Sequence, residues 1–256
     1  MREINLNKLK YSLIFWISQS YLEIKIKYRR SIIGPWWITL STGIIILGLS
    51  LVFSGLFNMS ASEIIPWIAI SLVIWNYIQM VINDATTLFE AAPLGTFKLN
   101  PLDIVSINVF KNIMMFCHNF VIVILIMIFF KIPVELASFT FIYGIIIILL
   151  TSISVEIIIA TLCLRFRDFV QIVQSLLFLT FIMTPIFWKP EILEGRRSFL
   201  VDYNILYHYI ETIRSPILFQ VINFKSVIIA SIATIFLMIT AYITFKKTVH
   251  KLVYWK

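Results

Sequence analysis

Charge is scarce in this chain of 256 residues, and it is absent altogether from six long stretches. Only 13% of the residues are Asp, Glu, Lys or Arg, whereas 60% are hydrophobic, and a water-soluble domain of this length cannot bury so much apolar surface. Each stretch has about twenty residues, and a helix of that length crosses the hydrocarbon core of a bilayer. The predicted spans are residues 36–57, 64–83, 112–130, 136–155 (extendable to 164), 169–188 and 226–245.

Residues that carry metal, thiol or nucleotide chemistry are also few. The chain has two cysteines and three histidines, and neither an H-E-x-x-H nor a C-x-x-C motif occurs. Cys117 and Cys163 fall in apolar stretches, so we expect two inert buried thiols. Gly43 and Gly48 have the spacing of a phosphate-binding loop, but Leu49 replaces its essential lysine. We predict no metal site and no cofactor on this chain.

The form of the apolar stretches predicts the fold class. They are continuous and do not alternate with polar residues, which favours helices over a β-barrel, because backbone groups in lipid must be paired within the protein. We therefore predict an all-α, polytopic integral membrane protein with six transmembrane helices. Its parts are an N-terminal interfacial helix (1–30), a transmembrane domain (31–246) and a C-terminal tail (247–256). No cleaved leader is expected, because the first charge-free run begins only after Arg30.

Lys and Arg are unevenly distributed between the two sides, which predicts the orientation, because cytoplasmic flanks are enriched in them. With the N-terminus inside, 15 of the 21 basic residues lie on the cytoplasmic side. The six outside are Lys131, Lys189, Arg196, Arg197, Arg214 and Lys225. Both termini are therefore predicted to be cytoplasmic. The net charge of +8 is then a topology signal, and nucleic acid is not expected as a partner.

The first thirty residues have a helical apolar stripe with basic residues around it. This pattern predicts an amphipathic helix that lies on the inner leaflet and binds membrane lipid. Residues 23–27 also alternate as a short strand would, but a lone strand beside a membrane has no pairing partner. The stripe consists of Leu6, Leu9, Leu13, Ile17, Tyr21, Ile24 and Tyr28.

One carboxylate, Glu156, lies deep in an apolar stretch. Ionisable groups inside a membrane are costly, and they often mark ion or proton pathways. Glu156 is nevertheless close in sequence to Arg165, Ser152 and Ser154. A protonated or hydrogen-bonded helix-packing residue is therefore an equally good interpretation.

Three segments carry more specific sequence. Residues 27–37 read KYRRSIIGPWW, RFRD at 165–168 precedes TPIFW at 184–188, and residues 204–216 read NILYHYIETIRSP. These resemble the signatures RYRRSxLGPLW, RYRD…TPIFW and NPLYHLIExxRxP of permease subunits of type 2 ABC exporters. That group moves O-antigen, capsular polysaccharide or teichoic acid. The resemblance covers almost the whole chain, although Ile205 stands where the family usually has proline.

The resemblance implies how the protein works. It implies a homodimer that acts with a dimer of a separate ABC ATPase, which binds ATP and Mg²⁺, while this chain performs no bond chemistry and is not an enzyme. The cargo would be a lipid-linked, O-antigen-like polysaccharide that leaves through the bacterial cytoplasmic (inner) membrane. The outer loop 189–225 would form two short re-entrant helices that act as a gate. Its candidate residues are Tyr203, Tyr207 and Arg214.

The link at 89–101 contains the helix breakers Pro93, Gly95 and Pro101, which predict a short, compact cytoplasmic element. In the family this link is a coupling helix that sits in a groove of the ATPase. A solvated turn with a hydrophobic anchor is the competing interpretation for any single residue. The coupling candidates are Phe89, Glu90, Lys98 and Leu99.

Aromatic and basic residues near the ends of the spans complete the predicted site. Aromatic rings offer flat faces on which sugar C–H groups can pack, and basic groups can bind the diphosphate of a lipid-linked glycan. Interfacial aromatic belts and inside-positive anchoring would place the same residues there. The substrate-path candidates are Trp36, Trp37, Phe181, Phe187 and Trp188. The diphosphate candidates are Lys27, Arg29 and Arg30.

Two other functions remain as alternatives. A membrane-embedded transferase acting on lipid-linked sugars would gather Asp, Glu or His at one membrane face, yet Asp84, Glu90, Asp103 and Asp168 are dispersed among separate loops. A type 2 ABC permease for a drug or lipid would share the fold. The aromatic content of the chain favours a polymer over such a cargo.

Overall fold

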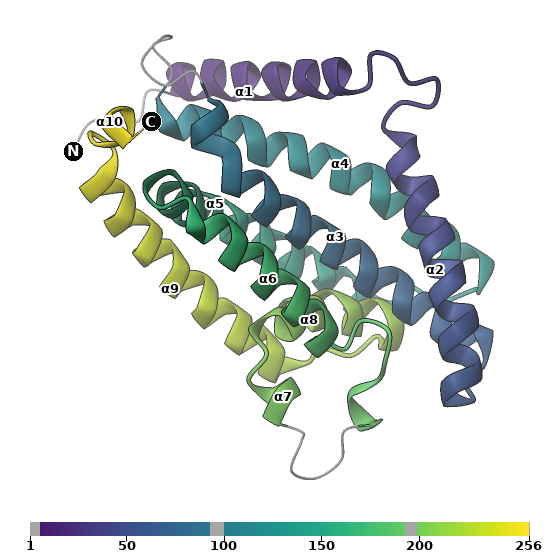
Figure 1. Ribbon diagram of the computed structural model, residues 1–256. Coiled ribbons are helices and arrows are strands. Elements are labelled where there is room, and N and C mark those ends of the chain that lie inside the picture. The colour runs from purple at the N-terminus through teal and green to yellow at the C-terminus, as the bar shows by residue number, and fades with distance from the viewer. Residues whose placement is uncertain (1–5, 93–99, 193–198, 256) are drawn as a thin grey trace.

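The computed structural model describes residues 6–92, 100–192 and 199–255 (Figure 1). Helices dominate these ranges, and no strand occurs among the residues described, which confirms the all-α prediction for this part of the chain. In chain order the elements are α1 (Leu6–Lys27), α2 (Trp36–Phe57), α3 (Ala61–Ala91), α4 (Pro101–Phe129), the 3-10 helix η1 (Leu136–Thr140), α5 (Phe141–Arg165), α6 (Asp168–Met183), η2 (Pro190–Ile192), α7 (Phe199–Asp202), α8 (Ile205–Phe219), α9 (Phe224–Thr248) and α10 (Leu252–Trp255).

Five helical segments are long and apolar enough to cross a membrane, namely α2, α3, α4, η1 with α5, and α9. They coincide with five of the six predicted spans. α3 extends beyond the predicted residues 64–83 as far as Ala91, because no helix breaker occurs before Pro93. α4 begins at Pro101, where the missing N–H costs nothing, and the carboxylate of Asp103 accepts a hydrogen bond from the N–H of Asn100 at 3.2 Å.

The segment expected to form the sixth span is a shorter helix. The prediction covers residues 169–188, whereas α6 ends at Met183 after 16 residues, a length of about 24 Å. Pro185 explains this end, because proline disfavours the helical conformation in the residue before it. Thr184 is accordingly extended, with φ −85° and ψ 133°. A sixth crossing therefore stays a prediction.

α3 is the central helix of the bundle and contacts α2, α4, α5, α6 and α8. Half of the buried residues of the main hydrophobic core lie on it, including the fully buried Ile68, Ile74 and Trp75. A second, smaller core lies where α1 and α10 are found, and it includes Phe89 and Leu252. α1 and α10 lie at one end of the bundle, and α7 and α8 lie at the other (Figure 1). We call these the α1 end and the α8 end.

α1 crosses the α1 end of the bundle and packs on α4 (Figure 1). Its Trp16 Nε1 donates to Asp103 Oδ1 at 2.9 Å, and its Ser20 Oγ donates to the Ile107 carbonyl at 2.7 Å. The predicted apolar stripe is divided between two environments. Ile24 is buried, whereas Tyr21 is 58% exposed. One edge of α1 thus belongs to the protein core, and the other stays available for lipid.

A tight turn joins α1 to α2. Ser31 Oγ accepts a hydrogen bond from the N–H of Gly34 at 3.0 Å. Gly34 has φ +64°, a left-handed conformation that side chains with a Cβ adopt only at a cost. Pro35 follows and precedes the first residue of α2. The chain therefore changes direction within a few residues between the two helices.

α8 lies at the opposite end, packed against α3, α5 and α9. Ten consecutive residues, His208 to Ile217, are buried, so the outer loop predicted at 189–225 contains a helix that belongs to the core. Gly144 of α5 permits the close approach, because a Cβ there would lie 2.6 Å from Ile213 Cγ1 and 3.1 Å from the Thr212 carbonyl oxygen. Whether α8 re-enters the membrane stays a prediction.

Candidate functional site

An open groove lies between α2, α3 and α6, with a volume of about 530 Å³. Three of its amide side chains, Asn76, Gln79 and Asn83, recur at helical spacing on α3 and so share one face. Gln174 of α6 adds a fourth amide. Gln79, Asn83 and Gln174 are exposed, and Asn76 donates to Thr42 Oγ1 of α2 at 3.2 Å.

Three of these amides sit on α3, which is long and apolar enough to cross a membrane. Polar side chains at that depth are unfavourable against lipid, and they face protein or a watery cavity instead. The groove is therefore a polar surface for which lipid is an unfavourable neighbour.

Aromatic rings line the groove and continue from it. The ring centroid of Phe181 lies 5.3 Å from that of Trp75 and 5.7 Å from that of Phe187. Phe187 in turn stacks on Phe53 of α2 at 4.8 Å. Two of the predicted path residues, Phe181 and Phe187, are thus brought together. Trp75 and the four amides were missed by the sequence analysis, although the spacing of Asn76, Gln79 and Asn83 was a readable signal.

The remaining path candidates lie apart from this ring cluster. Trp36 and Trp37 are 47% and 59% exposed at the start of α2, about 26 Å along the helix from Phe53. Trp36 packs edge-on against His118, with a centroid distance of 5.4 Å. Trp188 is half-buried beyond the end of α6. Trp36 and Trp37 are therefore separated from the Phe181–Phe187 cluster, and Trp188 makes no ring contact with that cluster among the described residues.

The predicted diphosphate residues lie at the α1 end of the bundle, as do the coupling candidates that the structure describes. Lys27, Arg29 and Arg30 are exposed at the end of α1 and in the turn that follows it.

Of the coupling candidates, Phe89 is 1% exposed and belongs to the smaller core that also contains Leu252, so its ring is not on the surface. Glu90 is exposed. Lys98 and Leu99 lie outside the described residues.

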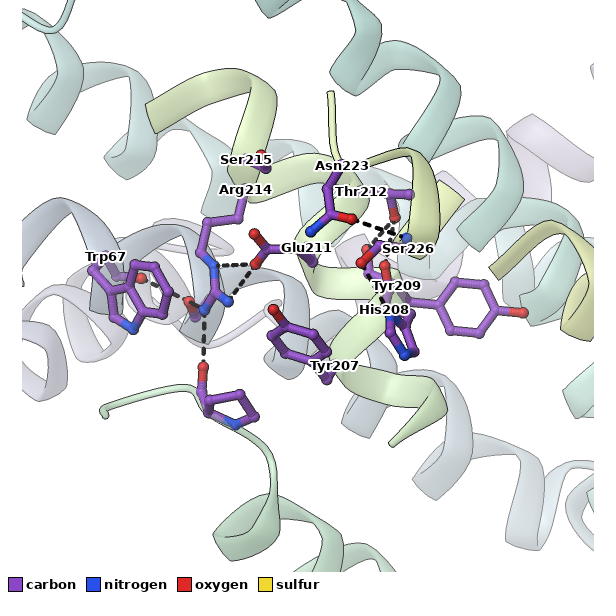
Figure 2. A network of polar contacts seen from close by, with 12 residues as sticks. Trp67, Tyr207, His208, Tyr209, Glu211, Thr212, Arg214, Ser215, Asn223 and Ser226 are labelled. Carbon is purple, nitrogen blue, oxygen red and sulfur yellow. Dashed lines mark hydrogen bonds and ion pairs between the residues drawn. The ribbon is translucent and has the colours of Figure 1, made fainter. Parts of the chain in front are cut away.

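A buried ion pair organises the α8 end (Figure 2). Arg214 is fully buried, and its Nε and Nη2 both donate to Glu211 Oε2 one turn earlier on α8. Its Nη1 donates to Ser71 Oγ of α3 and to the carbonyl of Pro185, each at 2.8 Å. The guanidinium carbon also lies 3.5 Å from the ring centroid of Trp67.

We call Arg214, together with Glu211, Ser71, Pro185 and Trp67, the Arg214 latch. Its contacts tie α8 to α3 and to the segment that follows α6. The other two gate candidates have smaller roles in it. Tyr207 is half-buried, with its ring centroid 5.8 Å from the guanidinium carbon. Burial, and next the Glu211 carboxylate, raise the pKa of the Tyr207 phenol, so it remains a hydrogen-bond donor. Tyr203 is 84% exposed and lies outside the latch.

His208 holds the start of α8 against the start of α9. Its Nε2 lies 2.9 Å from the Asp202 carbonyl oxygen, and its Nδ1 lies 3.0 Å from Ser226 Oγ. Burial lowers the pKa of His208, so the neutral ring donates from Nε2 and accepts at Nδ1. Asn204 and Asn223 cap the two helices by accepting from the N–H groups of Tyr207 and Ser226.

Glu156 is fully buried between α4 and α5. Its Oε1 accepts hydrogen bonds from Asn108 at 2.9 Å and Asn112 at 3.4 Å. Its Oε2 and the Asn112 Oδ1 have no hydrogen-bond partner among the residues that the structure describes. The two asparagine contacts favour the packing interpretation over an ion relay.

Substitution of Glu156 separates these interpretations. Glu156→Gln keeps an acceptor for both asparagines, so we expect thermal stability and transport close to wild type. Glu156→Leu leaves two buried amide groups without their acceptor, and we expect a loss of about 1–3 kcal/mol in the free energy of unfolding. Unfolding in detergent and transport in cells measure the two effects. A stable Glu156→Gln protein without transport would instead establish a relay.

The acidic residues near the α1 end act mainly as ion-pair and hydrogen-bond partners. Lys111 of α4 lies 3.5 Å from Glu23 of α1 and 3.3 Å from Asp84 of α3, while Asp103 accepts from Trp16. In the ranges 6–92, 100–192 and 199–255, no group of three or more His, Cys, Asp or Glu side chains is placed to hold a metal ion.

Comparison with known families agrees with this architecture. The family model described as ABC-2 type transporter matches residues 20–218, which is more than half of the chain and includes the groove and the Arg214 latch. No curated protein matches the chain with significance. The chain therefore belongs to the ABC-2 type transporter family, and it is an integral membrane subunit of a type 2 ABC transporter.

Proposed function

We propose that this subunit is the permease of an ATP-driven exporter that moves a lipid-linked, O-antigen-like polysaccharide across the bacterial cytoplasmic membrane. The observation that supports this cargo is the groove between α2, α3 and α6, where four amides lie beside aromatic rings. Amides exchange hydrogen bonds with sugar hydroxyls, and aromatic faces accept sugar C–H groups. A polymer can slide along such a surface, because no single contact fixes its register.

The permease acts as a homodimer in this proposal, with each copy covering the groove of the other. Exposed amides and rings on α3 and α6 would then line a shared path between the protomers instead of facing lipid. At the α1 end, which we place in the cytoplasm with both termini, Lys27, Arg29 and Arg30 would bind the diphosphate of the carrier lipid.

ATP hydrolysis by a separate ATPase dimer would drive the cycle. The ATPase would contact the link at 89–101, where Glu90 is the exposed candidate within the described residues. Force on the link would reach α4 at Asp103 and, through Trp16, α1. At the other end, opening of the outer gate would require release of the Arg214 latch. ATP shifts this equilibrium only by binding the two states with different affinity.

Removal of the groove amides tests the path. Gln79→Leu combined with Asn83→Leu should lower export about tenfold, because two hydrogen-bonding groups are lost where the polymer passes. Protein level should be unchanged, since both side chains are exposed in the protomer. The readout is surface polysaccharide in a strain that lacks its own copy of the permease.

Thr240→Leu is the matched control, because Thr240 is a half-buried polar residue on α9, away from the groove. Export by the double variant equal to that of the control would exclude the groove as the path.

The two alternatives predict different phenotypes. A deletion strain should accumulate undelivered glycan in the cytoplasm, with unchanged sensitivity to drugs. A drug or lipid permease would instead change drug sensitivity or lipid composition. A transferase would transfer a sugar in vitro without any ATPase, and that result would replace the present proposal.

A further inference from the structure

A second cavity, of about 450 Å³, lies at the α8 end next to the Arg214 latch. Its walls come from the start of α3, from the segment around η2 and from α8, so it forms only when these three parts are packed together. The volume falls in the range typical of small-molecule sites. The lining side chains that matter here are Trp67, Tyr207, Phe219, Lys189, Glu191 and Glu211.

Three of these side chains are aromatic and come from different segments. The rings of Trp67 and Phe219 have centroids 6.3 Å apart and are tilted by 52°. Tyr207 supplies a phenol from the first turns of α8, which Figure 2 shows directed toward the Arg214–Glu211 pair. Such walls offer ring surface to the C–H groups of a ligand and a hydroxyl group beside it.

Some hydrogen-bonding groups around this cavity have no partner among the described residues. Both bonds from Arg214 to Glu211 end on Oε2, so Oε1 is available to a ligand. The Nε1–H of the buried Trp67 has no hydrogen-bond partner among the described residues. Buried polar groups in proteins are nearly always paired. The cavity is therefore lined by an acceptor, Glu211 Oε1, that the latch does not use, and by the phenol of Tyr207.

The charges at the cavity select the class of ligand. Glu211 is neutralised by Arg214, and Lys189 lies 3.5 Å from Glu63. Glu191 at the exposed rim then opposes an anionic ligand. An organic cation would compete with the protein, because the guanidinium of Arg214 already lies over the Trp67 ring. A neutral ligand with several hydroxyl groups fits the remaining donors, acceptors and rings.

We propose that this cavity binds one or two neutral sugar units of the polymer at the α8 end of the path. The inference rests on the proposed function in taking the ligand to be part of the exported polysaccharide. Because Trp67 and Glu211 belong to both the cavity and the Arg214 latch, a bound sugar would contact the same side chains that hold α8 closed.

Binding of free sugars to the full-length protein tests this site. The protein is held in lipid nanodiscs without an ATPase and titrated with lipid-free neutral mono- and disaccharides of the gluco, galacto, manno, rhamno and N-acetylated series. Saturation-transfer NMR reports binding. We expect at least one saccharide to bind, and we expect Tyr207→Phe and Glu191→Gln each to weaken its binding about fivefold.

Trp255→Phe is the matched control, because Trp255 lies on α10 at the opposite end of the bundle. The affinity of this variant for the saccharide should equal that of wild type. Glu191→Gln alters an exposed side chain, and thermal unfolding of both variants verifies that they fold. Absence of binding by every saccharide would overturn the proposal. Equal affinity in wild type and both variants would do so too, as would binding of tetramethylammonium or inorganic phosphate in place of sugars.

The two proposals fail in different ways. A deletion strain that exports polysaccharide normally would end the proposed function, and the titration would still report on the cavity. A deletion strain that accumulates glycan, together with a protein that binds no sugar, would end the inference about the cavity alone.

Discussion

Arg214→Met should lower the free energy of unfolding by about 3–5 kcal/mol, the largest effect that we expect from any single substitution in this chain. The reason is the buried carboxylate of Glu211, which is 9% exposed and would lose its counter-charge. The Ser71 hydroxyl and the Pro185 carbonyl would lose their donor as well. Unfolding in mixed detergent micelles measures the loss, and export should disappear with it.

Two comparisons make this prediction specific. Lys225→Met breaks the ion pair with Asp202, whose members are 62% and 47% exposed, and an exposed pair contributes about 0–1 kcal/mol. Arg214→Met combined with Glu211→Leu removes both buried charges, so it should recover most of the stability. If Arg214→Met unfolded like Lys225→Met, the latch would have no structural role.

Arginine at this position is also expected to resist replacement by lysine. A single ammonium group cannot donate to Glu211, Ser71 and Pro185 in the fork geometry of a guanidinium. It also lacks the planar group that lies over the Trp67 ring. Arg214→Lys should therefore fall between the wild type and Arg214→Met.

Gly144→Ala should be the second most damaging change, at about 1–3 kcal/mol. Its Cβ would meet the backbone of Thr212, with the carbonyl oxygen at 3.1 Å and the carbonyl carbon at 3.2 Å. A helix backbone cannot turn aside as the end of a side chain does, so α8 must shift away from α5. Thermal unfolding measures the loss of stability. Export should also fall, because α8 carries Arg214.

Gly48→Ala on α2 is the control, because no atom lies within 4 Å of the Cβ that it would add. Alanine is favoured over glycine inside a helix by about 1 kcal/mol. The two substitutions should therefore act with opposite sign. A stabilising or neutral Gly144→Ala would show that α5 and α8 do not approach each other as closely as described.

The spans and the fold class could be predicted because they depend on local composition. A charge-free stretch of sufficient length specifies a helix in lipid whatever it packs against, and five predicted stretches coincide with helices long enough to cross. The end of α6 also depends on a local feature, Pro185. The prediction instead followed the apolar run as far as Trp188. Hydrophobicity marks where a helix is stable in lipid, and proline marks where it stops.

The candidate site was harder to predict from the sequence, because it depends on which helix faces pack against each other. Phe89 was expected to contact the ATPase, yet it is buried in the smaller core among residues of α4, α5, α9 and α10. Arg214 counts as an outer basic residue, yet it is fully buried. Its pairing with Glu211 was readable from the spacing of three residues, whereas its contacts with Ser71 and Pro185 join segments that are far apart in the chain.

The short connection between α1 and α2 affects how a movement of one helix is passed to the next. Trp16 and Ser20 attach α1 to α4, so α1 moves with α4 although its neighbour in the chain is α2. Any rotation of α2 relative to α4 must then be absorbed between Lys27 and Trp36, where Gly34 has a left-handed torsion and the ring of Pro35 fixes the next φ. Those bonds form a torsional hinge between α1 and α2, and its stiffness limits how far α2, with its wall of the groove, can turn while α1 stays in place.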